Sequence, residues 1–111
     1  MPGSYELHKN DKGQYGFSLK ADNGQVILRS ELYETKAAAS NGIASVQKNC
    51  ADDARYERLQ ASDGRPYFNL KAVNHQVIGT SQMYADAANR DAGIASVKTH
   101  GPTTTVKDLS A

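Results

Sequence analysis

The sequence FSLKADNGQVILRSELYETKAAASNGIASV at residues 17–46 returns at residues 68–97 as FNLKAVNHQVIGTSQMYADAANRDAGIASV. A constant offset of 51 residues superimposes the two stretches without a gap, so that Phe17 falls on Phe68. Repeated units bury their apolar faces against each other, because one unit alone cannot cover its own core. The duplication therefore predicts an architecture, although it contains no motif that names an activity.

The first copy contains a hairpin signal. Asn23-Gly24 separates two strand-like runs, residues 15–22 and 25–30. Asn-Gly between two such runs favours a type I′ turn, which needs positive φ at both central residues. The sequence therefore predicts a hairpin with a two-residue loop at this point.

A two-residue loop also predicts the register of the hairpin. Leu19 then faces Leu28, and side chains alternate between the two faces of the sheet. The residues expected to face the core are Phe17, Leu19, Ala21, Val26 and Leu28. Lys20 and Ile27 are expected on the outer face. In the second copy the turn is Asn74-His75, where His75 has to adopt a strained conformation if the turn geometry is kept.

Each hairpin is followed by a helix pattern. Thr35 and Asp86 are suitable N-caps, and the helices are expected over about Lys36–Lys48 and Ala87–Thr99. Glycine occupies the same position inside both helices, as Gly42 and Gly93. Glycine inside a helix costs about 1 kcal/mol relative to alanine. Its use twice at one position indicates a close approach between helix and sheet, and the alternative is a poorly formed helix.

The unit is thus β-β-β-α, present twice. We expect an α+β fold in which tandem β-β-β-α repeats form one antiparallel sheet with two helices packed on one face, related by a pseudo-twofold axis. Residues 1–111 are expected to form a single domain of two repeats, about 5–50 and 56–101. The tail, 102–111, is either a short strand that pairs across the repeat or disordered.

Composition argues against several classes of protein. The formal net charge is +1, which provides no electrostatic footprint for nucleic acid or for an anionic membrane. No stretch approaches the ~20 apolar residues of a membrane span, and the first residues lack the apolar region of a signal peptide. One cysteine, Cys50, excludes an internal disulfide. We expect a cytoplasmic monomer with its two repeats paired in cis.

The pattern F-x-L-K-A-x-N-x-Q-V-I-x-x-S-x-x-Y followed by G-I-A-S-V resembles the YegP-like family of small bacterial and archaeal proteins. The resemblance covers nearly the whole chain and both repeats. It implies an α+β fold of tandem or dimerised β-rich repeats with exchanged terminal elements. It implies no activity and no catalytic residues, because the family consists of domains of unknown function.

No catalytic constellation is apparent, so we expect no enzyme, no cofactor and no metal. Cys50 follows the predicted end of a helix, where the helix dipole raises the pKa of a thiol. The histidines, His8, His75 and His100, are far apart and form no pattern of metal ligands.

The remaining candidate is a surface. Lys20 beside Ile27, and Lys71 beside Ile78, predict a shallow apolar patch with a lysine rim on the outer sheet face, suited to a protein or peptide partner. The alternative is that lysine stems cover the isoleucines or that the sheet buries them. We therefore expect a non-catalytic protein- or peptide-interaction module. Nucleic-acid binding through the same face and small-ligand binding are the other hypotheses.

Overall fold

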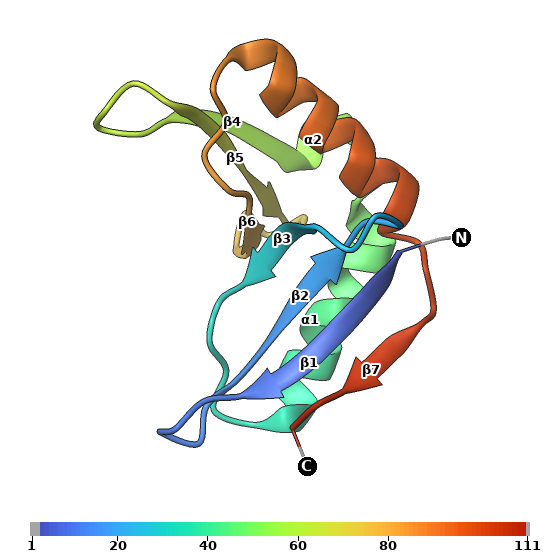
Figure 1. The fold of residues 1–111 in the computed structure, drawn as a ribbon. Coiled ribbons are helices and arrows are strands. Elements are labelled where there is room, and N and C mark those ends of the chain that lie inside the picture. The colour runs from blue at the N-terminus through green and yellow to red at the C-terminus, as the bar shows by residue number, and fades with distance from the viewer. Residues whose placement is uncertain (1–2, 111) are drawn as a thin grey trace.

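The computed structural model describes residues 3–110 as one sheet covered on one face by two helices (Figure 1). The strands are β1 (Ser4–Lys9), β2 (Tyr15–Lys20), β3 (Val26–Ser30), β4 (Tyr56–Gln60), β5 (Pro66–Lys71), β6 (Val77–Thr80) and β7 (Val106–Asp108). The helices are α1 (Lys36–Asn49) and α2 (Ala87–His100), and a short 3₁₀ helix, η1 (Asp53–Arg55), precedes β4. Thr35 and Asp86 cap the two α-helices as the sequence predicts, since each side chain accepts a hydrogen bond from a first-turn N–H.

The order of the strands shows how the repeats combine. It runs β4-β5-β6-β3-β2-β1-β7, so each repeat contributes three adjacent strands and the repeats meet where β3 pairs with β6. That junction is antiparallel, with Arg29 opposite Thr80. The predicted α+β fold, with tandem repeats in one sheet and two helices, is therefore confirmed. One pair departs from the expected antiparallel arrangement, because β7 runs parallel to β1.

Strand β7 is parallel for a reason that the repeat explains. At the offset of 51, Val106 corresponds to Arg55, the residue before β4. Strand β7 therefore begins where the first strand of a third repeat would begin. The position of a first strand is already filled by β1. The segment after α2 therefore lies alongside β1 and runs in the same direction (Figure 1). Of the two alternatives for the tail, the structure has the short strand.

The prediction of a two-residue type I′ turn in the first hairpin is wrong. Ala21 N–H donates to the carbonyl of Gln25, and Gly24 N–H donates to the carbonyl of Ala21. Only Gly24 of the Asn-Gly pair has positive φ, which fits a type I turn with a bulge rather than a type I′ turn. Lys20 consequently lies opposite Val26, with a register shift between Leu19 and Lys20. The second hairpin has the same shift, and His75 adopts a positive φ of 70°.

The core lies between the sheet and the helices and has the same aromatic arrangement in each half. The first repeat supplies Tyr5, Phe17 and Tyr33, and the second supplies Tyr56, Phe68 and Tyr84. The stacked pairs have centroid separations of 6.4 Å and 6.3 Å, so the pseudo-twofold relation extends to side chains. Helix α1 packs on β1 and β2 and also on β5 and β6, so each half covers part of the other.

The pseudo-twofold axis leaves room for only one of two equivalent side chains. A Cβ atom on Gly79 would lie 2.7 Å from Cγ of Leu28, its counterpart in the first repeat. A Cβ atom on Gly101 would lie 2.5 Å from Sγ of Cys50, again its counterpart. The sequence departs from exact repetition at these positions because two identical side chains would collide there.

Two buried tyrosines connect the first strands to the helix ends. The Tyr5 hydroxyl donates to the carbonyl of Gly101 at 2.6 Å, and the Tyr56 hydroxyl donates to the carbonyl of Cys50 at 2.6 Å. Each bond satisfies a carbonyl at the C-terminus of a helix that has no partner within the helix. Burial raises the pKa of both hydroxyls above the ordinary value of 10.0, which extends the pH range in which they act as donors.

Candidate functional site

The apolar patch predicted on the outer sheet face does not exist, because Ile27 and Ile78 are only 6% and 5% exposed. The bulge in each hairpin adds one residue, which turns the isoleucine towards the helices. Lys20 pairs with Glu6 at 3.1 Å, and Lys71 pairs with Glu57 at 3.0 Å. The lysines are therefore partners of carboxylates on the neighbouring first strands rather than a rim around an apolar surface.

The two outer edges of the sheet differ. On the first repeat, β7 covers the edge of β1: Tyr5 N–H donates to the carbonyl of Thr105 at 2.9 Å, and Leu109 N–H donates to the carbonyl of Leu7 at 2.7 Å. The Asp108 carboxylate on β7 also pairs with Lys36 at the start of α1. Strand β7 thus contributes main-chain hydrogen bonds to β1 and one ion pair to the helix beside it.

The equivalent edge, on β4, carries no strand within residues 3–110. Strand β4 pairs with β5 in the same register as β1 pairs with β2, so Arg58 takes the place of Leu7. The backbone N–H and C=O of Arg58 therefore point away from β5, into the position that β7 fills beside β1. A row of unpaired backbone groups at a sheet edge is a template for another strand.

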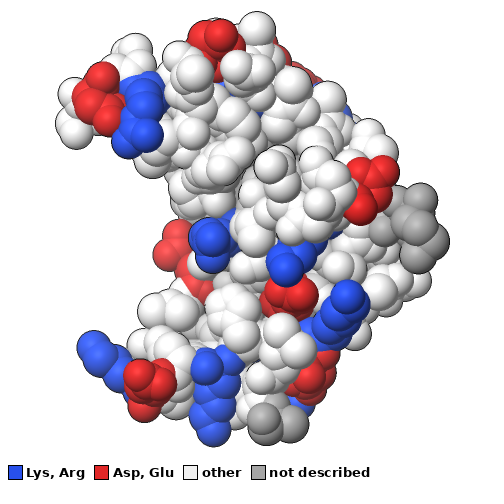
Figure 2. Space-filling view, viewed as in Figure 1, with Lys and Arg blue, Asp and Glu red and all other residues white. Residues whose placement is uncertain are grey.

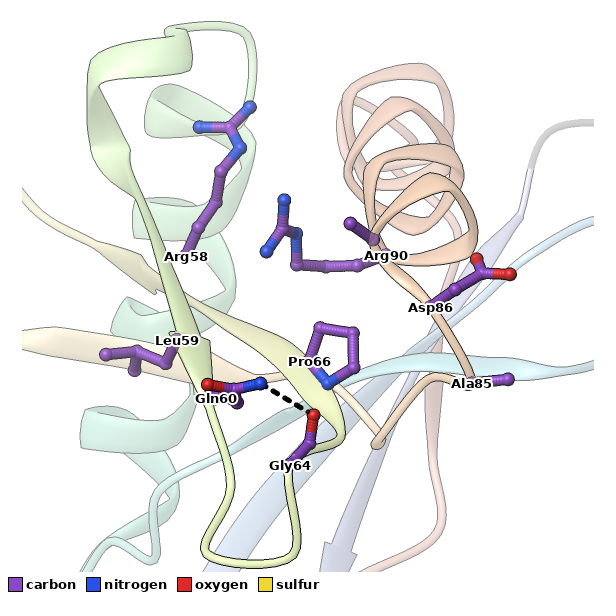
Figure 3. Close-up of a pocket in the computed structure, with 9 residues that line it drawn as sticks. Arg58, Leu59, Gln60, Gly64, Pro66, Ala85, Asp86 and Arg90 are labelled. Atoms are coloured by element: carbon purple, nitrogen blue, oxygen red, sulfur yellow. Dashed lines mark hydrogen bonds between the residues drawn. The ribbon is translucent and has the colours of Figure 1, made fainter.

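A groove runs beside this edge, between β4 and the first turns of α2 (Figure 3). Its volume is about 580 Å³, and Arg58, Pro66, Ala87 and Arg90 are among the residues that line it. We call it the β4–α2 groove. Asp86 also lines the groove, but its carboxylate caps α2 and is directed away from the two arginines (Figure 3). The corresponding space on the first repeat lies beside β1 and α1, where the Asp108–Lys36 pair forms.

Arg58 and Arg90 extend towards each other across the β4–α2 groove (Figure 3). Arg58 contacts Asp53 at 3.2 Å and Asp91 at 3.5 Å, and Arg90 contacts Asp91 at 3.1 Å. Lys98 also binds Asp53, at 2.9 Å, so this network joins three cations to two carboxylates. Nη1 of both arginines makes no hydrogen bond within the described residues. Donors that can bind another anion therefore remain at the groove.

The groove was not predicted, because its arginines are found where the repeats disagree. Leu7 and Ala39 of the first repeat become Arg58 and Arg90 in the second. Both first-repeat residues are buried, whereas their counterparts are charged. Comparison of the two copies position by position contains this signal, because one position on the first strand and one on the helix both change from an apolar residue to arginine.

The cysteine and histidine side chains do not come together into a catalytic or metal-binding site within residues 3–110. Cys50 is buried at the pseudo-twofold axis, and burial raises the pKa of its thiol. Nδ1 of His100 contacts Ser96 of its own helix, 3.1 Å from the hydroxyl. Within residues 3–110, no three His, Cys, Asp or Glu side chains form a group that could hold a metal ion. No helix in the same range has the length and apolar character needed to cross a membrane.

The ion pair between β7 and α1 makes the attachment of β7 dependent on pH. Lys36 lowers the pKa of Asp108 to about 2 from its ordinary value of 3.8. A carboxyl group with a lowered pKa stabilises the folded arrangement above pH 3.8, and that contribution is lost as the pH falls towards 2. We expect the protection factor of the Leu109 amide, which bonds to Leu7, to decrease over this range. In Asp108→Asn the decrease should be smaller, and equal profiles for the two proteins would contradict the expectation.

Comparison with known proteins agrees with the repeat. The chain matches "Domain of unknown function (DUF1508)" twice, over residues 10–57 and 61–108. The protein belongs to the DUF1508 family. The two matches differ by the offset of 51, and each ends in the strand that follows its helix, β4 in the first and β7 in the second.

Relatives of the same length support this assignment. A UPF0339 protein of Acinetobacter baylyi is 66% identical over 110 residues, which is 99% of each chain. The UPF0339 protein YegP of Escherichia coli K12 is 56% identical over 108 residues, 97% of this chain and 98% of that one. The resemblance to YegP-like proteins is thereby confirmed.

Solved structures confirm the fold as well. The solution NMR structure of a UPF0339 protein from Shewanella oneidensis has a TM-score of 0.94 at 58% identity, covering 99% of this chain and 93% of that one. The structure of the Escherichia coli protein yegP has a TM-score of 0.95 at 55% identity, covering 100% and 96%. The latter is described as a protein of unknown function.

Proposed function

We propose that this protein is a non-catalytic interaction module that binds an extended segment of a partner protein along the open edge of β4. The observation that supports this proposal is the pairing of β7 with β1. The chain itself contains one extended segment bound to one outer edge, and the equivalent edge is unpaired within residues 3–110.

Addition of a strand to an open sheet edge is a common form of peptide recognition, in which main-chain hydrogen bonds supply affinity and neighbouring pockets supply specificity. The β4 edge offers both elements. Arg58 presents its backbone N–H and C=O, while the β4–α2 groove lies on the helix side to receive side chains. The backbone N–H of Tyr56 is already bonded to the carbonyl of Asp53, so pairing would centre on Arg58.

The other two hypotheses have less support. On the face shown in Figure 2, basic and acidic side chains are interspersed rather than gathered into a basic stripe. Lys20 and Lys71, the lysines that the nucleic-acid hypothesis would use, are each paired with a glutamate. A small ligand would use the groove alone and would leave the open backbone groups of β4 unpaired.

A synthetic peptide of the β7 segment, TTTVKDL (residues 103–109), tests the proposal. We expect it to shift amide resonances of β4 and of the first turn of α2 in a saturable titration. Arg58→Pro should abolish those shifts, since proline removes the outward N–H but is tolerated on an edge strand. Arg58→Thr, which keeps the N–H, is the matched control for the backbone contact.

The spectrum of each variant establishes that it is folded. The proposal would be overturned if Arg58→Pro bound the peptide as well as Arg58→Thr, or if saturating peptide shifted no β4 amide in the parent protein. Sedimentation of the protein alone provides a second criterion. A dimer that excludes the peptide from β4 would identify a second copy of this chain as the occupant, and would also overturn the proposal.

A further inference from the structure

We propose that the segment bound at β4 runs parallel to the strand and carries a carboxylate residue, Asp or Glu, opposite Arg58. This inference rests on the proposed function, because it describes the partner of the same edge. It specifies two properties that strand addition alone leaves open, namely the direction of the segment and the chemistry of one side chain.

The direction follows from the internal template. On the first repeat, β7 pairs with β1 in parallel, with Val106 opposite Tyr5 and Asp108 opposite Leu7. Strand β4 has the register of β1 against its inner neighbour, so the backbone groups of Arg58 are placed as those of Leu7 are, while the N–H of Tyr56 is already bonded to Asp53. A parallel segment places its C-terminal part beside the first turn of α2, where the β4–α2 groove lies.

The side chain follows from the position of Asp108. Paired residues of adjacent strands project to the same face, so Asp108 projects with Leu7 towards the helices and reaches Lys36. At the β4 edge, the residue in this position would project with Arg58 towards α2. Position 36 becomes Ala87 in the second repeat, and the cation is supplied instead by Arg90, one turn further along the helix.

The charges at the groove favour an anion in this position. Asp86 lines the groove, but its carboxylate accepts from the N–H of Asn89 and is directed away from the arginines (Figure 3). The network of Arg58, Arg90 and Lys98 contains two carboxylates, those of Asp53 and Asp91, so the network itself has one positive charge in excess. An incoming carboxylate would compensate that charge and could accept hydrogen bonds from Nη1 of each arginine. Arginine binds carboxylates with two donors in a planar arrangement, which also fixes the orientation of the bound group.

Two peptides that differ only by Asp or Asn at one position distinguish this inference from strand addition alone. We expect TTTVKDL to bind the full chain about tenfold more tightly than TTTVKNL, which replaces the carboxylate by an amide. The difference should decrease as the salt concentration rises. In the double variant Arg58→Leu/Arg90→Ala, which restores the residues of the first repeat, the two peptides should bind equally.

A nitroxide on the peptide tests the direction. At the C-terminus of TTTVKDL it should broaden the amide resonance of Ala87, and at the N-terminus it should broaden that of Arg55. The reverse pattern would overturn the parallel arrangement. Equal affinity of the two peptides for the parent protein would overturn the carboxylate preference but leave strand addition in place. Failure of both peptides to bind would overturn this inference together with the proposed function.

Discussion

Gly42→Val is expected to lower the free energy of unfolding by about 1–3 kcal/mol, because the new side chain overpacks the contact between α1 and the sheet. A Cβ atom at position 42 would lie 2.8 Å from Cε2 of Phe17 and 2.7 Å from the hydroxyl of Tyr33. Phe17 is buried and packs against Tyr5, so its ring has no free space into which it can move. Denaturation in urea measures the change as a lower midpoint with an unchanged slope.

The equivalent substitution in the second repeat is the matched control. The three atoms nearest to a Cβ atom on Gly93 would all belong to Tyr84, with the hydroxyl oxygen at 2.2 Å. Tyr84 is half-buried and can rotate towards solvent, so Gly93→Val should cost less than Gly42→Val. Equal losses at the two positions would contradict this explanation, and an unchanged midpoint for Gly42→Val would show that Phe17 gives way.

The sequence predicted the architecture because the repeat constrains it at many positions at once. The offset of 51 defined the unit, Thr35 and Asp86 located the helix starts, and Gly42 and Gly93 indicated the close approach that the structure has. A single residue rarely predicts a packing contact. A residue that occurs at the same position in both copies does, because both copies have to be compatible with the same packed interface.

The features that escaped prediction are those in which a local choice or a difference between copies decides the outcome. Asn23-Gly24 is compatible with two turn types, and the bulged type moves Ile27 from the outer face to the core. The β4–α2 groove depends on Arg58 and Arg90, where the second repeat departs from the first. The residues that the two copies share predict the fold, whereas the positions at which the copies differ locate the β4–α2 groove.

A chain limited to residues 1–53 is expected to be unfolded or dimeric, whereas the full chain is expected to unfold as a monomer in one cooperative transition. Helix α1 packs on β5 and β6 as well as on its own strands, so the half-chain loses part of the surface that covers the helix. It also loses Gly101, whose carbonyl binds the buried hydroxyl of Tyr5, and β7, which covers the edge of β1. A unit of about 50 residues is marginal even with its core complete.

Sedimentation and thermal melting of the half-chain and the full chain decide the matter. If the half-chain dimerises, a second copy provides the packing surface that β5 and β6 provide within the full chain. The melting temperature of the half-chain should then rise with protein concentration. The full chain should melt at a temperature that is independent of concentration. A folded, monomeric half-chain as stable as the full chain would contradict the shared core, because helix α1 would then need nothing from the second repeat.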